Sequence, residues 1–456
     1  MTKRAKNLTS VDDSREQALL ILVKVFENKA YSNILLKNLK GDFSRLDRAF
    51  ITEIVYGTIK WKMKIDNIIS QFSKIKMKDI SPHILNILRI GIYQIDFMDR
   101  VPNSAAVDEC VKLSKKYGNI GASKFVNAVL RNYLRRHDNI KYPDKDKEAS
   151  KYLSIYYSYP EWMVSKLLCE FGESAAEDFL KSCNEVSPLT VRINSLKTTK
   201  EALRESLKSK GIYVSDSLYI DDALMLKNVP KIQSMDEYKK GFLTVQDESS
   251  MIAVKILAPK AGELVMDLCS APGTKSTYMA EMMGNKGTVI SGDINENKLK
   301  LVDQNAKRLG IDIISTFVND AAKHDGSYDG KADRVLIDAP CSGLGVMRKK
   351  PEIRWNRRRE DIEELKKIQR LILESSSPYV KLGGTLVYST CTVLKEENID
   401  LVRDFVRDSH KFVFEDITAW VPEKLRKDSL KDGYVQLFPN IDNVDGFFIA
   451  RLKRVR

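Results

Sequence analysis

The spacing of apolar residues predicts a helical first part of the chain. From residue 14 to residue 136, apolar positions recur every three or four residues, which places them on one face of a helix. Gly41, Pro82, Pro102 and Gly118 interrupt this pattern, and strand-like alternation is weak. We predict an all-α domain over residues 1–140, with a first helix capped by Ser14 and others at 47–61, 65–72, 84–97, 105–117 and 122–136. Residues 1–11 are polar and are predicted to be disordered.

The middle of the chain mixes helical and strand patterns. Residues 139–152 are charged and include Pro143, which is typical of a linker. Helices are then predicted at 161–171 and 175–184, and strands at 189–194 and 242–246. We therefore predict a linker and a small α+β domain over residues 141–240.

From residue 241 to the end, short apolar runs alternate with helical patterns. This alternation indicates a mainly parallel sheet with helices on both faces. Strands are predicted at 263–266, 288–293, 311–318, 334–337 and 384–388, and residues 446–452 are expected to form a late antiparallel edge strand. A strand, a tight Ala-Pro-Gly turn and a helix open this region, as in nucleotide-binding α/β folds. The predicted fold class is a Rossmann-like α/β domain over residues 241–456, preceded by the small α+β and all-α domains.

Charge is distributed unevenly along the chain. The net charge is +13, and residues 1–150 hold 28 Lys and Arg against 17 Asp and Glu. Such an excess in one domain favours a polyanionic partner, most simply nucleic acid, although an ordinary solvated lysine surface remains an alternative. No apolar run has the length of a membrane span or the form of a signal core, so we expect a cytoplasmic protein with no membrane partner. Six cysteines without a Cys-x-x-Cys pair, and only four histidines, predict no metal site.

Polar and reactive residues follow five of the predicted strands. The turn at 269–275 lacks the Gly-Lys-Ser/Thr ending of a phosphate loop and the three glycines of a dinucleotide site, yet it can bring backbone N–H groups close to a ligand. Asp293 ends the next strand, where a carboxylate can bind ribose hydroxyls. Cys341 and Cys391 follow two later strands. One such residue alone could be a solvated loop position, but the whole set predicts a ligand site at the carboxyl edge of the sheet.

Six short motifs carry the most specific functional signal. They are Gln246-Asp247-Glu248-Ser249-Ser250, Asp267-x-Cys269-Ser270-Ala271-Pro272-Gly273-x-Lys275, Asp338-Ala339-Pro340-Cys341-Ser342-Gly343-x-Gly345, Arg348-x-x-Pro351-x-x-x-Trp355, Tyr388-Ser389-Thr390-Cys391-Thr392 and Asp445-Gly446-Phe447-Phe448. In these motifs the chain resembles the SAM-dependent RNA cytosine-C5 methyltransferases. Residues 103–109 and 125–131 resemble the NusB-type RNA-binding domain. Together they resemble the RsmB (Sun) type of bacterial 16S ribosomal RNA methyltransferases; Thr274 departs from the family, which usually has a second glycine there.

The resemblance implies methyl transfer from S-adenosyl-L-methionine (SAM) to C5 of a cytosine in 16S rRNA. C5 is a poor nucleophile, and a thiolate that adds to C6 makes C5 enamine-like. The resemblance assigns the nucleophile to Cys391 and product release to Cys341, although a reversal of these roles remains open. Asp338 is expected to contact base N3 or the exocyclic amine, or else to shape the cofactor site. Lys275 is expected to orient Asp338.

The resemblance also implies the residues that bind SAM and RNA. The SAM residues are Cys269, Ser270, Ala271, Pro272, Gly273, Thr274, Lys275, Asp293, Asn319, Asp320 and Asp338. For RNA we predict Arg348, Arg354, Trp355 and Arg131, because basic side chains around a stacking ring suit a splayed RNA strand; a solvated basic loop is the alternative. The expected partner is 16S rRNA, bound by a monomer. A tRNA substrate, and a non-enzymatic RNA-binding assembly factor, are the competing hypotheses.

Overall fold

The computed structural model describes residues 12–39 and 41–456, which form two compact units. The helical unit extends to Asn184 and also includes Lys350–Arg357, and the α/β unit comprises Glu185–Lys349 and Arg358–Arg456. The prediction for residues 1–11 lies outside the described residues. The first unit therefore extends beyond the boundary expected at residue 140, and it includes a segment from the last third of the chain.

The helical unit is built from amphipathic helices around one apolar core. Leu19 and Leu22, for example, are buried in this core together with Ile87 and Val126. Asp12, and not Ser14, caps the first helix, since its side chain accepts from the N–H of Arg15 while Ser14 lies inside the helix. The helices are α1 (Asp13–Asn28), α2 (Ser32–Lys37), α3 (Arg45–Lys60), α4 (Lys62–Phe72), α5 (Pro82–Phe97), α6 (Asn103–Tyr117), α7 (Ile120–Arg135), α8 (Ala149–Tyr157), α9 (Glu161–Phe171), α10 (Glu173–Ser182) and α16 (Ile353–Asn356).

Helices α8–α10 belong to the helical unit because buried polar contacts hold them there. Ser158, at the end of α8, accepts from the N–H of Met63 in α4 at 2.9 Å. Tyr159 is buried and donates its hydroxyl to the carbonyl of Leu180 at 3.0 Å. By their contacts, residues 141–184, which were predicted as a linker and part of the small α+β domain, group with the helical unit, and the domain boundaries stay predictions.

The α/β unit contains a small antiparallel sheet in the order β2-β3-β1-β4. Its strands are β1 (Leu189–Ile193), β2 (Tyr213–Asp216), β3 (Ala223–Lys227) and β4 (Leu243–Val245), and its helices are α11 (Lys200–Ser209) and α12 (Asp236–Lys239). Leu203 and Leu207 of α11 pack on Val191 and Leu224 of the sheet. Strands β1 and β4 match the predicted ranges, whereas β2 and β3 were not predicted.

The large sheet has the order β10-β12-β9-β8-β5-β6-β7, with β11 also paired to β12. Strands β9, β8, β5, β6 and β7 are parallel, and β12 is antiparallel to β9. The predicted late strand is therefore antiparallel but is not an edge strand, because β10 and β11 pair with it. The strands are β5 (Leu264–Asp267), β6 (Thr288–Asp293), β7 (Ile314–Val318), β8 (Ala332–Asp338), β9 (Val380–Thr390), β10 (Phe412–Phe414), β11 (Tyr434–Leu437) and β12 (Phe447–Arg454).

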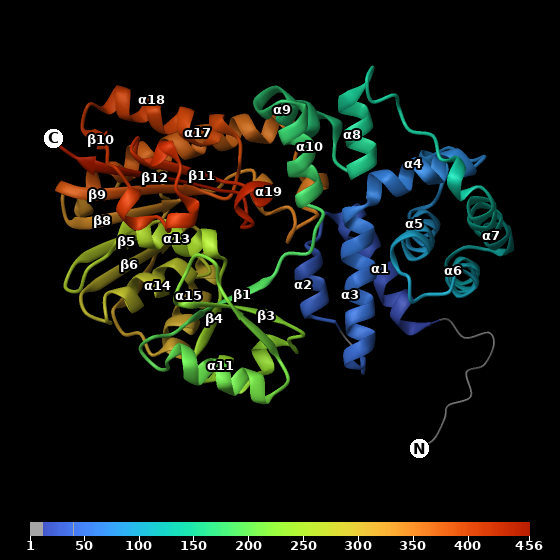
Figure 1. Cartoon of the computed structure of the whole chain (residues 1–456), viewed down its shortest axis with the longest axis horizontal. Coiled ribbons are helices and arrows are strands. Elements are labelled where there is room, and N and C mark those ends of the chain that lie inside the picture. Colours follow the sequence, from blue (N-terminus) through green and yellow to red (C-terminus); the bar gives the residue numbers. More distant parts are fainter. Residues whose placement is uncertain (1–11, 40) are drawn as a thin grey trace. The chain divides into compact units, whose positions relative to one another are not determined.

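Helices cover both faces of this sheet, as Figure 1 shows. One face packs against α13 (Glu248–Leu257), α14 (Thr274–Met282) and α15 (Glu296–Leu309), and the other against α17 (Arg359–Ser376) and α18 (Ile399–Ser409). A short helix, α19 (Pro439–Asp442), precedes β12. In such a sheet the carboxyl ends of the parallel strands share one edge, where ligands bind.

A buried arginine joins the small sheet to α14, the helix that follows β5 of the large sheet. Arg192 of β1 makes two hydrogen bonds to the carboxylate of Glu281 in α14, at 2.9 and 3.0 Å. It also donates to the carbonyl of Thr274 at 2.7 Å, and both charged side chains are buried. Because a bidentate guanidinium–carboxylate pair fixes orientation, this contact holds the start of α14 in place.

Candidate functional site

Two cysteines meet at the carboxyl edge of the large sheet. Cys341 follows β8 and Cys391 follows β9, and these strands are parallel neighbours. The two Sγ atoms are 3.3 Å apart. Cys341 is buried, with 8% of its surface exposed, whereas Cys391 is half-buried. The hydrogen bond to Cys391, followed by burial, raises the pKa of the Cys341 thiol well above its ordinary value.

An ion pair lies at the same edge. Lys275, in the first turn of α14, donates to Asp338 at 2.6 Å, and Ser389 at the end of β9 donates to the other oxygen of Asp338 at 2.8 Å. Burial acts to lower the pKa of Lys275, but the charge of Asp338 and their hydrogen bond outweigh it and raise that pKa. A thiolate on Cys391 would raise it further. The expected contact between Lys275 and Asp338 is therefore present, and Lys275 is close enough to Cys391 to interact with its charge.

A pocket of 320 Å³ lies beside these residues, at the ends of β5, β6, β7 and β8. Six residues that were predicted to bind the cofactor line it: Cys269, Ala271, Asp293, Asn319, Asp320 and Asp338. Ser270, Pro272, Gly273, Thr274 and Lys275 are not among the lining residues, and Lys275 faces Asp338 instead. The other lining residues are Leu268, Ile294, Lys298, Ala321, Pro340, Ile368 and Ile372.

The polar groups around this pocket fit a nucleoside ligand. The Nδ2 of Asn319, which lines the pocket, is buried without a hydrogen-bond partner among the described residues. Buried polar atoms normally have partners, so this amide is suited to a bound ligand. Asp293 accepts from the N–H groups of Ala271 and Asn295, which orients its carboxylate at the end of β6. Burial raises the pKa of Cys269, a thiol that stays protonated and inert in this environment.

The backbone of the loop explains why Thr274 is tolerated. Gly273 has a φ of 94° and precedes α14 as its N-cap. A Cβ at Gly273 would lie 2.9 Å from Cγ1 of Val302, so this position requires glycine. Thr274 is the first residue of α14 and is not among the described residues with positive φ. The departure from a second glycine therefore leaves the loop geometry intact.

The apolar part of the pocket was not predicted from the sequence. Ile294 directly follows Asp293 and is 69% exposed, although it is a large aliphatic side chain. An exposed aliphatic residue directly after a strand-end acid is the sequence feature that could have predicted an apolar surface for the flat ring of a nucleoside. Ile368 and Ile372 come from α17, and nothing in the sequence pairs that helix with the turn after β5.

The prediction that Arg354 contacts RNA is wrong. Arg354 is 0% exposed and lies in the helical unit. Its guanidinium donates to the carbonyls of Lys60, Ser158 and Cys183 and stacks on the ring of Tyr159, 3.8 Å from the centroid. A buried arginine usually pairs with a carboxylate. Among the described residues Arg354 has no such ion pair, and the dipoles of three carbonyl groups stabilise its positive charge instead.

Trp355 and Arg348 also have internal partners. The indole of Trp355 packs on the helical core and donates to the carbonyl of Ile59 at 2.7 Å. Arg348 belongs to the α/β unit, where it pairs with buried Asp445 at 2.5 Å and leaves only 6% of its side chain exposed. Contact of Arg348 with RNA is therefore contradicted by its burial, whereas stacking of RNA on Trp355, which is partly exposed, stays a prediction.

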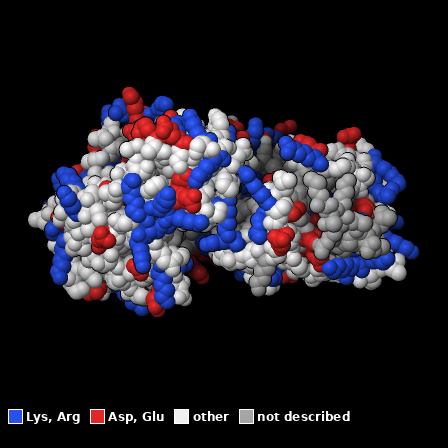
Figure 2. All heavy atoms as spheres, turned by 90° about the horizontal axis from the view of Figure 1, so that it is seen from below, with Lys and Arg blue, Asp and Glu red and all other residues white. Residues whose placement is uncertain are grey.

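Arg131 remains exposed and lines a groove of 500 Å³ between α6 and α7 of the helical unit. Its Nε donates to Asn127 at 2.8 Å, and Lys124 lines the same groove. On the face drawn in Figure 2, Lys and Arg side chains lie in several groups with Asp and Glu side chains between them. RNA contact at Arg131 stays a prediction.

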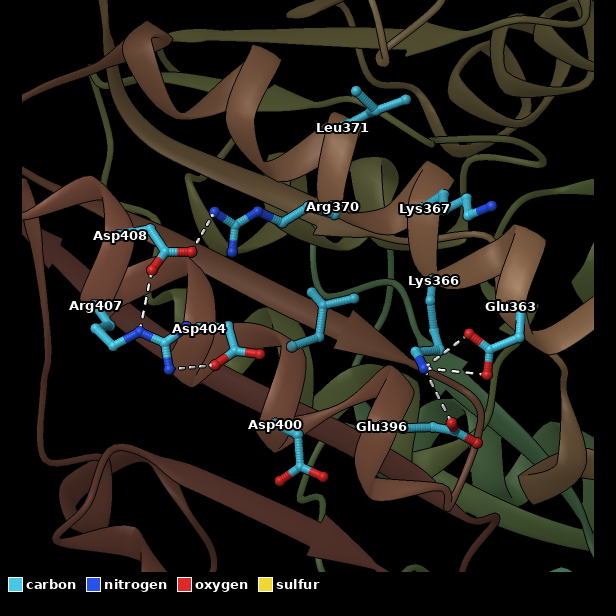
Figure 3. A pocket seen from close by; sticks show the side chains of 11 residues that line it. Glu363, Lys366, Lys367, Arg370, Leu371, Glu396, Asp400, Asp404, Arg407 and Asp408 are labelled. Atoms are coloured by element: carbon cyan, nitrogen blue, oxygen red, sulfur yellow. Dashed lines mark hydrogen bonds and ion pairs between the residues drawn. The ribbon is translucent and has the colours of Figure 1, made fainter.

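A hollow of 650 Å³ between α17 and α18 contains no predicted site residue. Most of its lining charges form ion pairs with one another. Figure 3 shows Lys366 pointing toward Glu363 and Glu396, and Arg407 toward Asp408. Because these ion pairs satisfy one another, we assign the hollow no role in the chemistry.

None of the helices in residues 12–39 and 41–456 is long and apolar enough to span a membrane. Within the same residues, no cluster of His, Cys, Asp and Glu side chains could hold a metal ion.

Comparisons with known proteins agree with this architecture. The family described as 16S rRNA methyltransferase RsmB/F matches residues 254–453, the NusB family matches residues 12–135, and a ferredoxin-like domain of the RsmF/B type matches residues 159–233. The predicted fold class is thereby confirmed, with an all-α NusB-like domain, a small α+β domain and a Rossmann-like methyltransferase domain.

Two relatives match over nearly the whole chain, and a third shares the fold over two thirds of it. A probable ribosomal RNA small subunit methyltransferase B of Bacillus subtilis (strain 168) is 36% identical over 96% of this chain and 98% of its own length. The solved structure of PH0851 is 27% identical with a TM-score of 0.82, over 98% of this chain and 99% of that one. NSun6 from Pyrococcus horikoshii, solved with SFG, shares the fold at 22% identity and a TM-score of 0.59, over 66% of this chain and 99% of that one.

Proposed function

Because the chain belongs to the ribosomal RNA small subunit methyltransferase B family, we propose that it transfers a methyl group from SAM to C5 of a cytosine in 16S rRNA. The reaction proceeds through a covalent bond between Cys391 and C6 of the base. The observation that carries this proposal is the pair of thiols 3.3 Å apart, beside the Lys275–Asp338 ion pair. Two cysteines and a charged pair at one sheet edge suit covalent catalysis on a pyrimidine ring better than simple binding.

The pocket at the strand ends would hold the cofactor. Asp293 would bind the ribose hydroxyls, Asn319 and Asp320 the adenine, and the loop at 269–273 the methionine part. The unpaired Nδ2 of Asn319 supports this assignment. When bound, SAM supplies an electrophilic methyl group. Ile294 and Ile368 exclude water from one side of the pocket.

Cys391 is the nucleophile in this proposal. Its thiolate adds to C6, which makes C5 able to accept the methyl group. A base, in the simplest case water, then takes the C5 proton, the C5–C6 double bond re-forms, and the C6–S bond breaks to release the Cys391 thiolate. The positive charge of Lys275 lies on the side of Cys391, and a neighbouring cation favours a thiolate. The hydrogen bond to Cys391 and burial raise the pKa of Cys341, so this thiol stays protonated. Cys341 is therefore assigned to product release.

Asp338 and Lys275 would recognise the base. Both oxygens of Asp338 already accept hydrogen bonds, so it acts as an acceptor for the exocyclic amine of cytosine. Lys275 carries a proton toward the ring nitrogen N3, where negative charge develops when the thiolate adds. The target base must leave its stack to reach this edge.

A 5-fluorocytidine substrate tests the proposal. Fluorine at C5 blocks the elimination step, so a working nucleophile stays bonded to the RNA on a denaturing gel. With SAM and a fluorinated 16S fragment, the parent and Cys341→Ala should form the adduct and Cys391→Ala should not. Loss of the adduct only in Cys341→Ala would reverse the two roles. A parent that binds SAM but gives an adduct with tRNA instead of rRNA would change the substrate, and a parent without SAM binding or adduct would sink the proposal.

A further inference from the structure

Two consecutive buried residues, Glu397 and Asn398, make hydrogen bonds to the loops that carry the two cysteines. Glu397 ends the short helix η7 (Lys395–Glu397), and Asn398 precedes α18. Both side chains are 0% exposed. Buried polar side chains whose hydrogen bonds are all satisfied make the structure around them rigid. The hydrogen-bond partners of Glu397 and Asn398 therefore show which segments these two residues hold in place.

Glu397 holds the loop that carries Cys341. Its carboxylate accepts from the N–H of Ser342 at 2.8 Å and from the Ser342 hydroxyl at 2.5 Å. It also accepts from the amide of Gln369 at 3.0 Å, and that amide donates to the carbonyl of Pro340 at 2.9 Å. The residues on both sides of Cys341 are therefore fixed through Glu397.

Asn398 holds the loop that carries Cys391 in the same manner. Its Oδ1 accepts from the hydroxyl of Thr390 at 2.5 Å, and its Nδ2 donates to the carbonyl of Thr392 at 3.1 Å. These two residues flank Cys391. Neighbouring positions on one short segment thus fix the two cysteine loops.

A hydroxyl bridge connects the two halves. The hydroxyls of Ser342 and Thr392 are 2.8 Å apart. An ionised carboxylate accepts only, so Ser342 donates to Glu397 and must accept from Thr392. The bridge has one direction, which removes rotational freedom from both loops.

Glu397 also places an unbalanced charge near one thiol. Among the ion pairs of the described residues, none includes Glu397, whereas its neighbour Glu396 pairs with Lys366 at 3.1 Å in the hollow of Figure 3. The negative charge of Glu397 raises the pKa of Cys341, after the larger effects of the hydrogen bond to Cys391 and of burial. A buried charge acts over longer distances than one in water.

We propose that Glu397 and Asn398 are positioning residues that set the separation of the two thiols, and that the charge of Glu397 keeps their shared proton on Cys341, so that Cys391 carries the thiolate. This inference rests on the proposed function for its meaning in catalysis. It concerns which thiol is ionised and how the two loops are aligned.

The variant Glu397→Gln separates charge from shape, because an amide oxygen can still accept from the N–H of Ser342. Removing the negative charge should move the acidic limb of the pH profile for adduct formation to lower pH, by about one unit. We also expect kcat to fall about tenfold, because less of the thiolate then resides on Cys391, with KM for RNA within about twofold of the parent. Glu396→Gln is the matched control and should change neither. An unmoved pH limb in a folded, SAM-binding Glu397→Gln protein would overturn the inference.

Two further measurements keep the test decisive. If Glu397→Gln does not fold, Ser342→Ala removes the hydroxyl bridge and leaves the charge, and a kcat within about twofold of the parent would overturn the positioning role. The pH dependence of alkylation of Cys391 by iodoacetamide needs no RNA and reports the same ionisation. A parent that is inactive on RNA would therefore refute the proposed function, while the alkylation profile of Glu397→Gln would still decide this inference.

Discussion

At the scale of single residues, the site is governed by charges that the fold buries. The acids that follow the strands were predictable, because strand ends in α/β sheets bind ligands and the motifs at 267–275 and 338–345 mark them. Asp267, the last residue of β5, is only 1% exposed, and it accepts from the hydroxyl of Ser276 at 2.6 Å. Burial raises the pKa of Asp267 to about 7.

This shift predicts a pH-dependent stability. A carboxyl with a higher pKa in the folded than in the unfolded chain binds its proton more tightly when folded, so it stabilises the fold at low pH and loses that effect as pH rises from about 4 to about 7. Asp267→Asn mimics the protonated form and should gain about 3 to 4 kcal/mol relative to the parent across that window. Thermal unfolding at pH 5 and pH 8 should show about 2 to 3 kcal/mol of this difference, because pH 5 already lies inside the window. Asp221→Asn, at an exposed position, is the control. An equal Tm difference at both pH values would contradict the prediction.

The residues that were not predicted share one property. Glu397 and Ile368 act on residues far away in the sequence, such as Ser342 and the turn after β5. Local pattern identifies a reactive side chain at a strand end, but it does not identify which distant side chain holds that strand end in place. The cysteines were therefore predictable, and their supporting residues were not.

At the scale of elements, most strands and helices followed from apolar spacing. The strand predicted at 288–293 is β6, with the same bounds, and the helix predicted at 161–171 is α9. β3 was missed because its residues Ala-Leu-Met-Leu-Lys include no β-branched or aromatic side chain, and β2 because only two of its four residues are apolar. The expected edge position of β12 was wrong because edge position depends on the short strands β10 and β11, which its own sequence does not reveal.

The turn before α14 provides a test at this scale. Gly273→Ala would strain a residue with a φ of 94° and would also push against the Cα of Val302 at 3.0 Å. Gly284→Ala has a φ of 60° with nothing within 4 Å of its Cβ, so it is a matched control. Both changes should cost about 1 to 2 kcal/mol of stability, but only Gly273→Ala should weaken SAM binding, about tenfold or more. Calorimetric titration with SAM checks this, and equal affinities for the two variants would contradict it.

At the scale of the whole molecule, the chain order and the structural units do not coincide. Lys350–Arg357 lies between two segments of the α/β unit in the sequence but belongs to the helical unit. Glu352 accepts from Ser32, and Arg354 and Trp355 donate to carbonyls of the same unit. Deleting residues 1–140 would remove Ser32, Ile59 and Lys60, which are partners of these buried groups, so such a deletion would not report on RNA binding alone. Point variants of single arginines separate the two effects.

Arg354 and Arg131 provide that comparison, because both lie in the helical unit and only one is exposed. Arg354→Ala leaves three carbonyls without their donor and should cost on the order of 3 to 5 kcal/mol of stability.

Arg131→Ala removes an exposed charge and should change stability by no more than about 0.5 kcal/mol. If Arg131 contacts an RNA phosphate, its loss should lower the slope of log affinity against log salt by about 0.7 to 0.9. Thermal unfolding and rRNA binding at several salt concentrations measure both effects. A stable Arg354→Ala protein would show that the helical unit does not depend on this buried cation, and an unchanged salt slope for Arg131→Ala would remove the α6–α7 groove from the RNA interface.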